Sequence, residues 1–209
     1  MALSTLRFST FNVASQVFYQ SSSRLSFALV NLKPLVPGHV LVVPTRVVPR
    51  LRDLTADEVT DLFQSVHQIS KVIEIEYKAQ ALNIALQDGP MAGQSVPHVH
   101  VHIIPRRAKD FEPLDEMYNA LDVKNLTEDF AEAYAARPSR AERKAFEAEQ
   151  RERQRGNVDS PFSGIEDKER RVRSEGEMRI EAERLRSLFP EQNRGVREEQ
   201  EEEERVGRS

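Results

Sequence analysis

The sequence predicts an α+β domain followed by a charged C-terminal part of a different kind. Five short segments in the first 105 residues have the apolar, β-branched composition of strands, and one long helical pattern separates the third from the fourth. Beyond Pro138 the apolar pattern is lost, because 36 of the last 72 residues are Asp, Glu, Lys or Arg.

The first three strands are expected within the N-terminal 44 residues. Residues 13–20 give the weakest strand signal, whereas residues 25–31 and 38–44 are short, apolar and rich in valine. The sequence KPLVPG between the last two has the Pro and Gly chemistry of a turn. We therefore expect those two strands to be neighbours.

A long helix is expected next. Thr55 and Glu58 have the T-x-x-E spacing of a capping box, which predicts the helix start. The apolar residues that follow recur at helical spacing and predict one buried stripe. The members of this stripe are Val59, Leu62, Phe63, Val66, Ile69 and Ile73.

The chain then returns to strand character. We expect a strand at residues 81–87, a loop at 88–95 because of its Gly and Pro residues, and a further strand from residue 96 that Pro105 closes. A short helix is expected around residues 115–121.

The charged composition divides the chain further. We expect residues 1–135 to form the domain, 136–173 a charged and mostly disordered insert, 174–190 a helix, and 191–209 a disordered acidic tail. Ser174 and Glu177 repeat the capping-box spacing. The helix has an apolar stripe with which it can dock on the domain, formed by Met178, Ala182, Leu185 and Phe189.

The bulk composition excludes several classes of function. The net charge of −4 does not indicate the positively charged surface that a nucleic acid polymer would need. The absence of cysteine rules out thiolate metal sites, and no apolar run is long enough to cross a bilayer. The Ser/Thr-rich N-terminus has a faint likeness to a transit peptide, but only Arg7 and Arg24 are basic before Lys33. We expect a cytoplasmic protein that also has access to the nucleus.

Three of the five histidines fall within five residues, at His98, His100 and His102. Residues two apart share a face in a strand but not in a helix, and on that face they lie about 6.5–7 Å apart. The alternation therefore predicts three imidazoles on one face of a strand, with Val99 and Val101 facing the core.

Three uses of these imidazoles compete. A purely structural role is a poor explanation for three histidines in strict alternation. A zinc site would need a further ligand, which His39 could supply. In covalent catalysis on a phosphate, one neutral imidazole attacks and its neighbours orient it and stabilise charge.

The surrounding residues favour the phosphate chemistry. The Gly-Gln-Ser loop just upstream has small residues whose amides could cradle phosphate oxygens. Gln87, Gln94 and Ser95 offer uncharged polar contacts near the same end of the strand. Only Asp88 is close enough in sequence to act as the carboxylate partner that a zinc site would favour.

These residues resemble a known family. HVHVHII (residues 98–104) is similar to the signature of the histidine triad superfamily, and QDGPMAGQSV (87–96) with PGHVLVVP (37–44) resembles its fragile histidine triad branch, the dinucleoside polyphosphate hydrolases. The resemblance implies an antiparallel five-stranded sheet with two helices, paired into a homodimer. It also implies hydrolysis of diadenosine triphosphate to AMP and ADP, with Mg²⁺ or Mn²⁺ bound through the substrate. Pro97 departs from the branch, which commonly has a basic residue there.

The resemblance assigns roles to particular residues of this chain. His100 would attack the α-phosphorus and form a nucleotidyl-histidine intermediate, and His102 would contact the phosphate oxygens. His98 and His39 would orient the site, and Asn31 would contact the ribose or base. Phosphate or nucleoside would be bound by Gln87, Gly93, Gln94, Ser95 and Val96.

Two other functions remain open from the sequence. The same fold serves nucleoside phosphoramidate hydrolases and nucleotidyl transferases. The charged arm is also compatible with a signalling module in which the bound dinucleotide is the signal and slow hydrolysis ends it.

Overall fold

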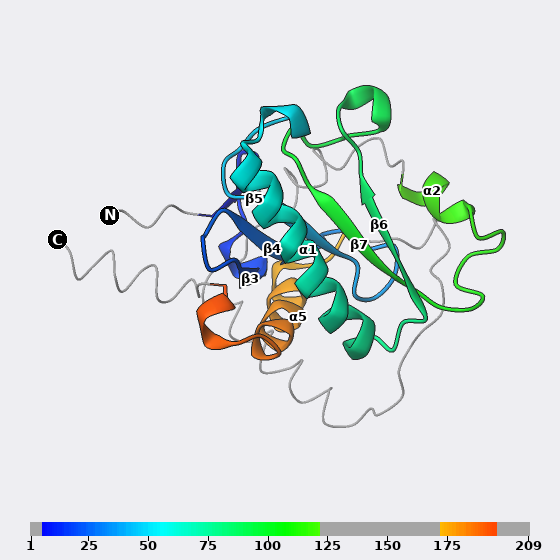
Figure 1. Ribbon diagram of the computed structural model, residues 1–209. Coiled ribbons are helices and arrows are strands. Elements are labelled where there is room, and N and C mark those ends of the chain that lie inside the picture. The colour runs from blue at the N-terminus through cyan, green and yellow to red at the C-terminus, as the bar shows by residue number, and fades with distance from the viewer. Residues whose placement is uncertain (1–5, 122–171, 196–209) are drawn as a thin grey trace.

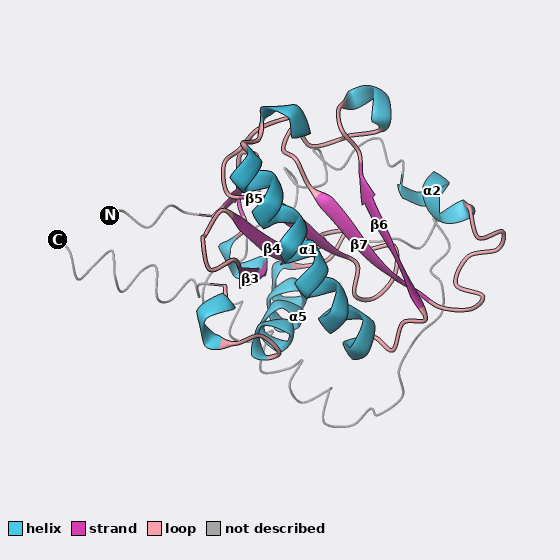
Figure 2. Ribbon diagram, in the orientation of Figure 1, coloured by secondary structure: helices cyan, strands magenta, loops and turns pink. Residues whose placement is uncertain are grey.

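The computed structural model describes residues 6–121 and 172–195, which form a five-stranded sheet with helices packed against it (Figures 1 and 2). All neighbouring strands are antiparallel, in the order β3-β4-β5-β7-β6. The strands of this sheet are β3 Val17–Gln20, β4 Ser26–Val30, β5 Val40–Pro44, β6 Ala81–Leu86 and β7 Val101–Arg106. A separate two-stranded hairpin consists of β1 Arg7–Phe8 and β2 Phe11–Asn12.

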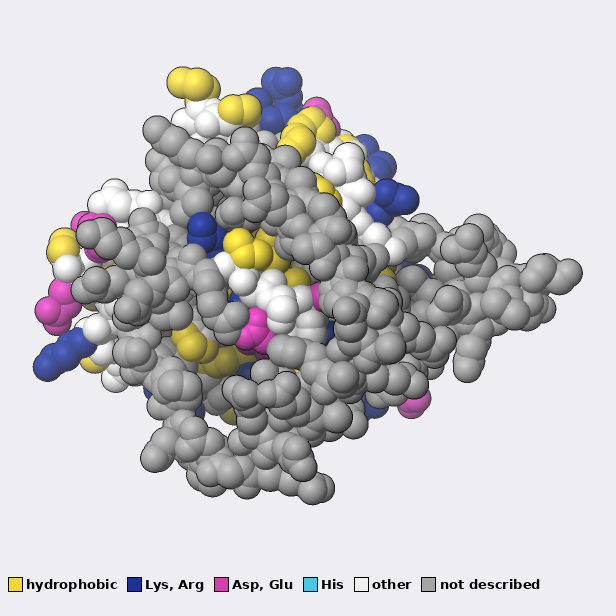
Figure 3. Space-filling model, turned by 180° about the vertical axis from the view of Figure 1, so that it is seen from behind, with side chains coloured by type: hydrophobic (Ala, Val, Ile, Leu, Met, Phe, Trp, Pro, Cys, Tyr) yellow, Lys and Arg dark blue, Asp and Glu magenta, His cyan; other side chains and the backbone are white. Residues whose placement is uncertain are grey.

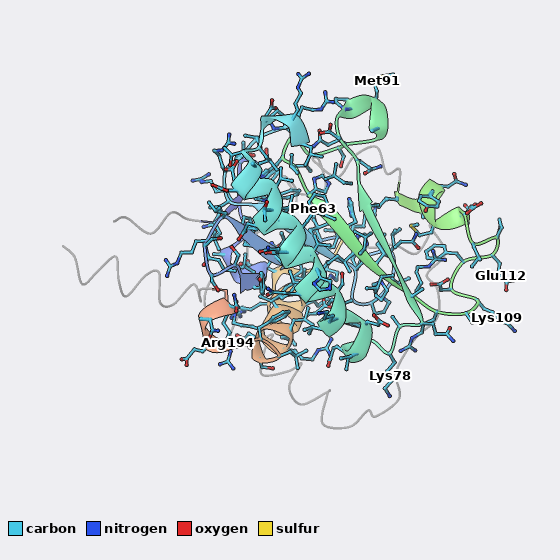
Figure 4. The ribbon with its side chains drawn as sticks, in the orientation of Figure 1. Phe63, Lys78, Met91, Lys109, Glu112 and Arg194 are labelled. Carbon is cyan, nitrogen blue, oxygen red and sulfur yellow. The ribbon has the colours of Figure 1, made fainter. Side chains whose placement is uncertain are left out.

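Helix α1, Ala56–Glu76, crosses the front of the sheet in Figure 1. Its start is the predicted capping box: the Thr55 hydroxyl accepts from the Glu58 amide, and the Glu58 carboxylate accepts from the Thr55 amide at 2.8 Å. Four of the six residues of the predicted stripe are buried; Val59 is half-buried, and Phe63 is 44% exposed and points away from the sheet (Figure 4). The buried members of the stripe are Leu62, Val66, Ile69 and Ile73.

The two faces of β7 pack in different apolar clusters. Val101 and Ile103 of β7 belong to the main core cluster, which also contains the buried side of α1. Side chains alternate along a strand, so His102 and Ile104 project from the opposite face. There Ile104 joins a second cluster with Leu35 and with Met117 of α2, Glu116–Leu121, the short helix expected around residues 115–121.

Helix α5, Glu175–Ser187, lies in the second described stretch and starts at the second predicted capping box, Ser174 with Glu177. Its predicted apolar stripe is buried in the main core cluster together with β3 and α1. None of the helices in the two described stretches has both the length and the apolar character needed to cross a membrane.

Several strand boundaries differ from the prediction, most of all those of β3 and β7. Residues 14–16 form a 3₁₀ turn, η1 Ala14–Gln16, so β3 begins only at Val17. β7 runs through Pro105 to Arg106, because its pairing with β5 ends at Ile103 and leaves that side of the strand open. β7 also begins at Val101, so of the three alternating histidines only His102 lies in it.

The late start of β7 has a physical cause. β6 ends at Leu86, which pairs with Val101, and the pairing of β5 with β7 also ends at Val101, opposite Val42. Residues before Val101 therefore have no regular strand partner on either side. The chain bends instead, with the His98 amide bonded to the Val96 carbonyl at 2.8 Å.

Most of the predicted insert, residues 136–171, lies outside the described residues, as do 122–135 and the tail from 196 onward. Two parts of the predicted disordered segments are ordered. Arg173 is bonded to the end of β4, and residues 191–195 contain a 3₁₀ turn, η5 Glu191–Asn193, and a bridge between Arg194 and Tyr19 at the sheet edge. Bonds to strand backbone hold these segments despite their polar composition. Figure 4 labels Arg194 at this position.

Candidate active site

The structure brings four of the five histidines together. His100 and His102 have ring centroids 4.9 Å apart, and His102 and His39 have centroids 5.1 Å apart. His98 lies beside them, since its ring and that of His100 both contact Phe8, at 5.7 and 5.3 Å. None of these four rings is more than 3% exposed. No histidine is visible among the described side chains on the face that Figure 3 presents.

The hydrogen bonds of His39 fix which of its nitrogens carries the proton. The Leu35 amide donates to Nδ1 of His39 at 3.1 Å, so this nitrogen has the lone pair. A neutral imidazole then carries its proton on Nε2. That N–H faces Nδ1 of His102 at 2.9 Å and donates to it.

His102 takes the complementary state as a result. Its Nδ1 accepts from His39, so its proton lies on Nε2. Nε2 of His102 is buried and has no hydrogen-bond partner among the residues that the structure describes. A buried donor without a partner is costly, about 1–3 kcal/mol, and such groups in native proteins call for an explanation. Binding of an anionic ligand oxygen would satisfy it.

His100 has the opposite state. Its Nδ1 lies 2.7 Å from the carbonyl oxygen of His98, and since a carbonyl only accepts, Nδ1 carries the proton. The Nε2 lone pair of His100 is therefore available for attack on an electrophile. The adjacent rings of His100 and His102 thus present one nucleophilic nitrogen and one hydrogen-bond donor.

His98 is bonded through both nitrogens. Nε2 donates to the Pro44 carbonyl at 2.9 Å, and Nδ1 accepts from the Ser9 amide at 3.1 Å. Because Pro44 ends β5 and Ser9 lies in the β1–β2 hairpin, His98 ties the bend before β7 to two other segments. These bonds of His98 go to backbone and not to another imidazole, and its orienting role stays a prediction.

Burial keeps these imidazoles neutral. It lowers the pKa of His98 to about 4 against a partial opposing effect of the Pro44 carbonyl, and it lowers the pKa of His100 as well. The pKa of His102 lies well below its usual value because of burial first and then the neighbouring His100 and His39. All three rings are therefore uncharged at neutral pH, which is the form that has a nucleophilic lone pair.

Asn31 lies next to His39. It follows β4, and its side-chain oxygen accepts from the Lys33 amide at 3.0 Å, which leaves its amide nitrogen 3.2 Å from Nε2 of His39. Both nitrogens carry protons in the tautomer that the Leu35 amide selects, so their approach is a contact and not a hydrogen bond. The Asn31 side chain projects from the same face as His39 and His102, because Asn31 stands opposite His39 in the continuation of the β4–β5 register.

Two backbone amides of the predicted phosphate loop form hydrogen bonds within the loop's own turn. It follows η3, Pro90–Ala92, where Gly93 takes a φ of +86°, and the amides of Gly93 and Gln94 donate to Pro90 and Gly89. These two amides are not the free cradle that the sequence suggested, because the turn uses them. Figure 4 shows Met91 at the outer tip of this loop.

The other predicted binding residues surround this loop. The Gln94 side chain donates to the Pro49 carbonyl at 2.9 Å, and Val96 is buried next to the His98 bend. Gln87, directly after β6, and Ser95 are half-buried. The structure joins the histidines and Asn31 directly, whereas this loop is tied to them through backbone.

Sequence reasoning missed several contributors to the site. Phe8 packs on His98 and His100, the amides of Ser9 and Leu35 select imidazole tautomers, and the Pro44 carbonyl binds His98. Three of these four contributions come from the backbone, for which residue type gives no signal. Phe8 could only have been found as an apolar residue of the N-terminal segment.

The hydrogen-bond geometry bears on the zinc alternative. Both nitrogens of His39 and of His98 are occupied by protein partners. Within residues 6–121 and 172–195, no group of three or more His, Cys, Asp or Glu side chains is placed to hold a metal ion. The ring nitrogens of His39 and His98 are therefore not free to serve as ligands in the arrangement that the zinc alternative requires.

Comparison with known proteins adds an independent line of evidence. The HIT domain family model matches residues 10–109, which include all four clustered histidines. The asymmetrical bis(5'-nucleosyl)-tetraphosphatase of Schizosaccharomyces pombe is 59% identical over 117 residues, which are 56% of this chain and 63% of that protein. The bifunctional bis(5'-adenosyl)-triphosphatase/adenylylsulfatase FHIT of Arabidopsis thaliana is 54% identical over 109 residues, 52% of this chain and 59% of that protein.

A third relative is matched over more of its length. The bis(5'-adenosyl)-triphosphatase of Dictyostelium discoideum is 53% identical over 108 residues, which are 52% of this chain and 71% of that protein. The chain spans only about three fifths of the length of the first two relatives.

Proposed function

This chain belongs to the HIT domain family, and from that membership we propose that it hydrolyses dinucleoside 5′,5′-polyphosphates, with diadenosine triphosphate giving AMP and ADP. One observation carries the proposal: His100 and His102 present opposite imidazole states side by side, a lone pair and a donor. The names of the three relatives, a tetraphosphatase and two triphosphatases, support the same class of substrate.

The proposed reaction has two displacements at one phosphorus. Nε2 of His100 forms a bond to the α-phosphorus while the bond from that phosphorus to the bridging oxygen breaks, and ADP leaves. Water then attacks the same phosphorus, the phosphorus–nitrogen bond breaks, AMP leaves, and one proton of the water is released to solvent. The histidine thus divides one difficult displacement into two easier ones.

His102 has the stabilising role in this scheme. Its Nε2–H would donate to an oxygen of the α-phosphate, where charge develops in each displacement. A donor held in place before the reaction is worth about 10²–10³ in rate. Burial strengthens the interaction, because the attraction grows as the local dielectric constant falls. Because His100 and His102 are almost fully buried, substrate must displace the protein atoms that cover these two rings.

The remaining assignments belong to the same proposal. We assign Asn31 to the ribose or base, and Gln87 with Gly93, Gln94, Ser95 and Val96 to phosphate or nucleoside. Mg²⁺ or Mn²⁺ is assigned to the polyphosphate of the substrate. A homodimer and a cytoplasmic and nuclear location complete the proposal.

The decisive experiment traps the covalent intermediate. Protein mixed with diadenosine triphosphate and quenched during turnover should carry an adenylyl group, and peptide mapping should place it on His100. A His100→Asn variant should bind the substrate and carry no adenylyl group, whereas His67→Asn, which changes an exposed histidine of α1, should behave as the wild type. Label on another residue would overturn the assignment, and much faster turnover of an adenosine phosphoramidate would change the substrate class.

A further inference from the structure

Helix α5 lies outside the residues that match the HIT domain model, yet Glu181 of this helix is linked to both ends of the segment that leads to His39. Residues 31–39 connect β4 to β5, with Asn31 at one end and Gly38 and His39 at the other. The contacts pass through three side chains, Arg173, Glu181 and Tyr77.

Arg173 holds the Asn31 end. Its Nε donates to the Asn31 carbonyl at 3.0 Å, and its Nη2 donates to the same oxygen. Its backbone amide donates to the Leu32 carbonyl at 3.0 Å. Since the Asn31 amide in turn bonds to the His39 carbonyl, Arg173 fixes the backbone that lies directly opposite His39.

Tyr77 holds the Gly38 end. Its ring packs against Gly38 so closely that a Cβ atom at this position would lie 2.6 Å from ring carbons. Gly38 has a φ of +84°, which glycine adopts without strain, and it directly precedes His39. The position of the tyrosine ring therefore sets where the backbone can run as it enters His39.

Glu181 of α5 joins the two ends. Its carboxylate forms an ion pair with Arg173 and accepts a hydrogen bond from the Tyr77 hydroxyl at 2.5 Å. The side chains of Arg173 and Glu181 are only 16% and 15% exposed, so this ion pair is largely shielded from solvent. Burial, and then the charge of Glu181, raise the pKa of Tyr77, which keeps its hydroxyl a donor.

We propose that Glu181 is a positioning residue for the reaction: through Arg173 and Tyr77 it sets both ends of the 31–39 segment and thereby the His39 ring that directs the His102 proton. The inference rests on the proposed function for its kinetic consequence. Its structural consequence, the proton position on His102, holds whatever the substrate is.

A purely structural role for α5 is the alternative. The helix also buries Met178, Ala182 and Leu185 in the main core, so many substitutions in it would lower stability without bearing on the site. The test must therefore change the charge at residue 181 with little change of volume, and it must read the histidines directly.

The experiment compares Glu181→Gln with Glu183→Gln, a matched change at an exposed glutamate of the same helix. Nitrogen-15 NMR of the histidine rings in the full chain without substrate reports the tautomers of His39 and His102. Steady-state kinetics on diadenosine triphosphate report kcat and KM separately. Thermal unfolding shows that each variant is folded at the assay temperature.

Glu181→Gln should shift the ring resonances of His39 and His102 and populate a second His102 tautomer, while Glu183→Gln should leave both unchanged. We expect kcat to fall about 10- to 100-fold, the scale of a small misplacement of reacting groups, and KM to change much less. Arg173→Lys keeps the charge but loses the two-pronged bond to Asn31, and it should shift the same resonances if Glu181→Gln does not fold.

A folded Glu181→Gln protein with wild-type ring resonances and wild-type kcat overturns the inference. If the wild type does not cleave diadenosine triphosphate at all, the proposed function fails, and the NMR comparison alone decides the role of Glu181. Changed resonances with unchanged kcat would show that the helix reaches the rings without positioning them for catalysis, which also overturns it.

Discussion

His39 donates from Nε2 to Nδ1 of His102 across 2.9 Å, and this one bond determines where the proton of His102 lies. Without it, the His102 ring could carry its proton on either nitrogen. With it, the donor is fixed on the nitrogen that has no partner among the described residues. In the proposed reaction, His39 would therefore act through His102 and not through direct contact with substrate.

This relationship predicts that substitutions of the two residues are not additive. His102→Leu removes the donor and should lower kcat by about 10²–10³. His39→Leu should lower it less, since His102 keeps its ring but loses its fixed tautomer. The double variant should be about as slow as His102→Leu alone, because His39 has nothing left to direct. Losses of kcat that multiply in the double variant would mean that His39 acts independently.

The burial of His98 predicts a loss of stability in mild acid. Its pKa is about 4 in the folded protein and about 6.5 in the unfolded chain, so the unfolded state binds the proton more readily. The stabilising contribution is complete above pH 6.5 and is lost as the pH falls toward 4, by about 3 kcal/mol in the free energy of unfolding.

The measurement for His98 is urea unfolding at pH 7 and at pH 4. His98→Gln keeps a donor for Pro44 and an acceptor for Ser9 but cannot take up the proton, so its stability should fall less over this range. His67→Gln, at an exposed position of α1, should follow the wild type. Equal slopes for wild type and His98→Gln would contradict the assignment.

The state of His100 predicts how turnover depends on pH. Burial lowers the pKa of its ring, and the reactive form is the neutral one. Turnover should therefore persist below pH 6.5 and decline only as the pH falls through the lowered pKa. The measurement is kcat against pH with saturating substrate. An acid limb with its midpoint near 6.5 would show that His100 titrates like an exposed histidine.

Local features of the fold were predictable from the sequence. The capping boxes of Thr55 with Glu58 and Ser174 with Glu177 are formed, because both partners lie three residues apart on one helix turn. The strands predicted at residues 25–31, 38–44 and 81–87 also appear within one or two residues of their predicted bounds, since composition and alternation are properties of a short window. The short-range alternation placed the three imidazoles in the same region.

Contacts between distant residues could not be predicted in the same way. The bond from Ser9 to His98 spans 89 residues, and that from Arg173 to Asn31 spans 142. The start of β7 at Val101 depends on where β5 and β6 end, which is a property of the whole sheet. Residue type placed His39 among candidate ligands, but only the sheet register brings it against His102.

Gly38 provides a last prediction, at the place where α1, α5 and the site meet. An alanine at this position would meet the Tyr77 ring at 2.6 Å and would have to keep a φ of +84°. Strain of this kind costs about 1–3 kcal/mol. Gly38→Ala should therefore lower the free energy of unfolding by that amount, and it should lower kcat because the next residue is His39.

Lys78→Gly is the matched control, next to the same tyrosine. Lys78 already has a positive φ of 49°, so glycine relieves backbone strain there while it adds freedom to the unfolded chain. The two effects oppose each other, and stability and kcat should stay near wild-type values. If Gly38→Ala were as stable and active as Lys78→Gly, the Tyr77 ring would not set the path of the chain into His39.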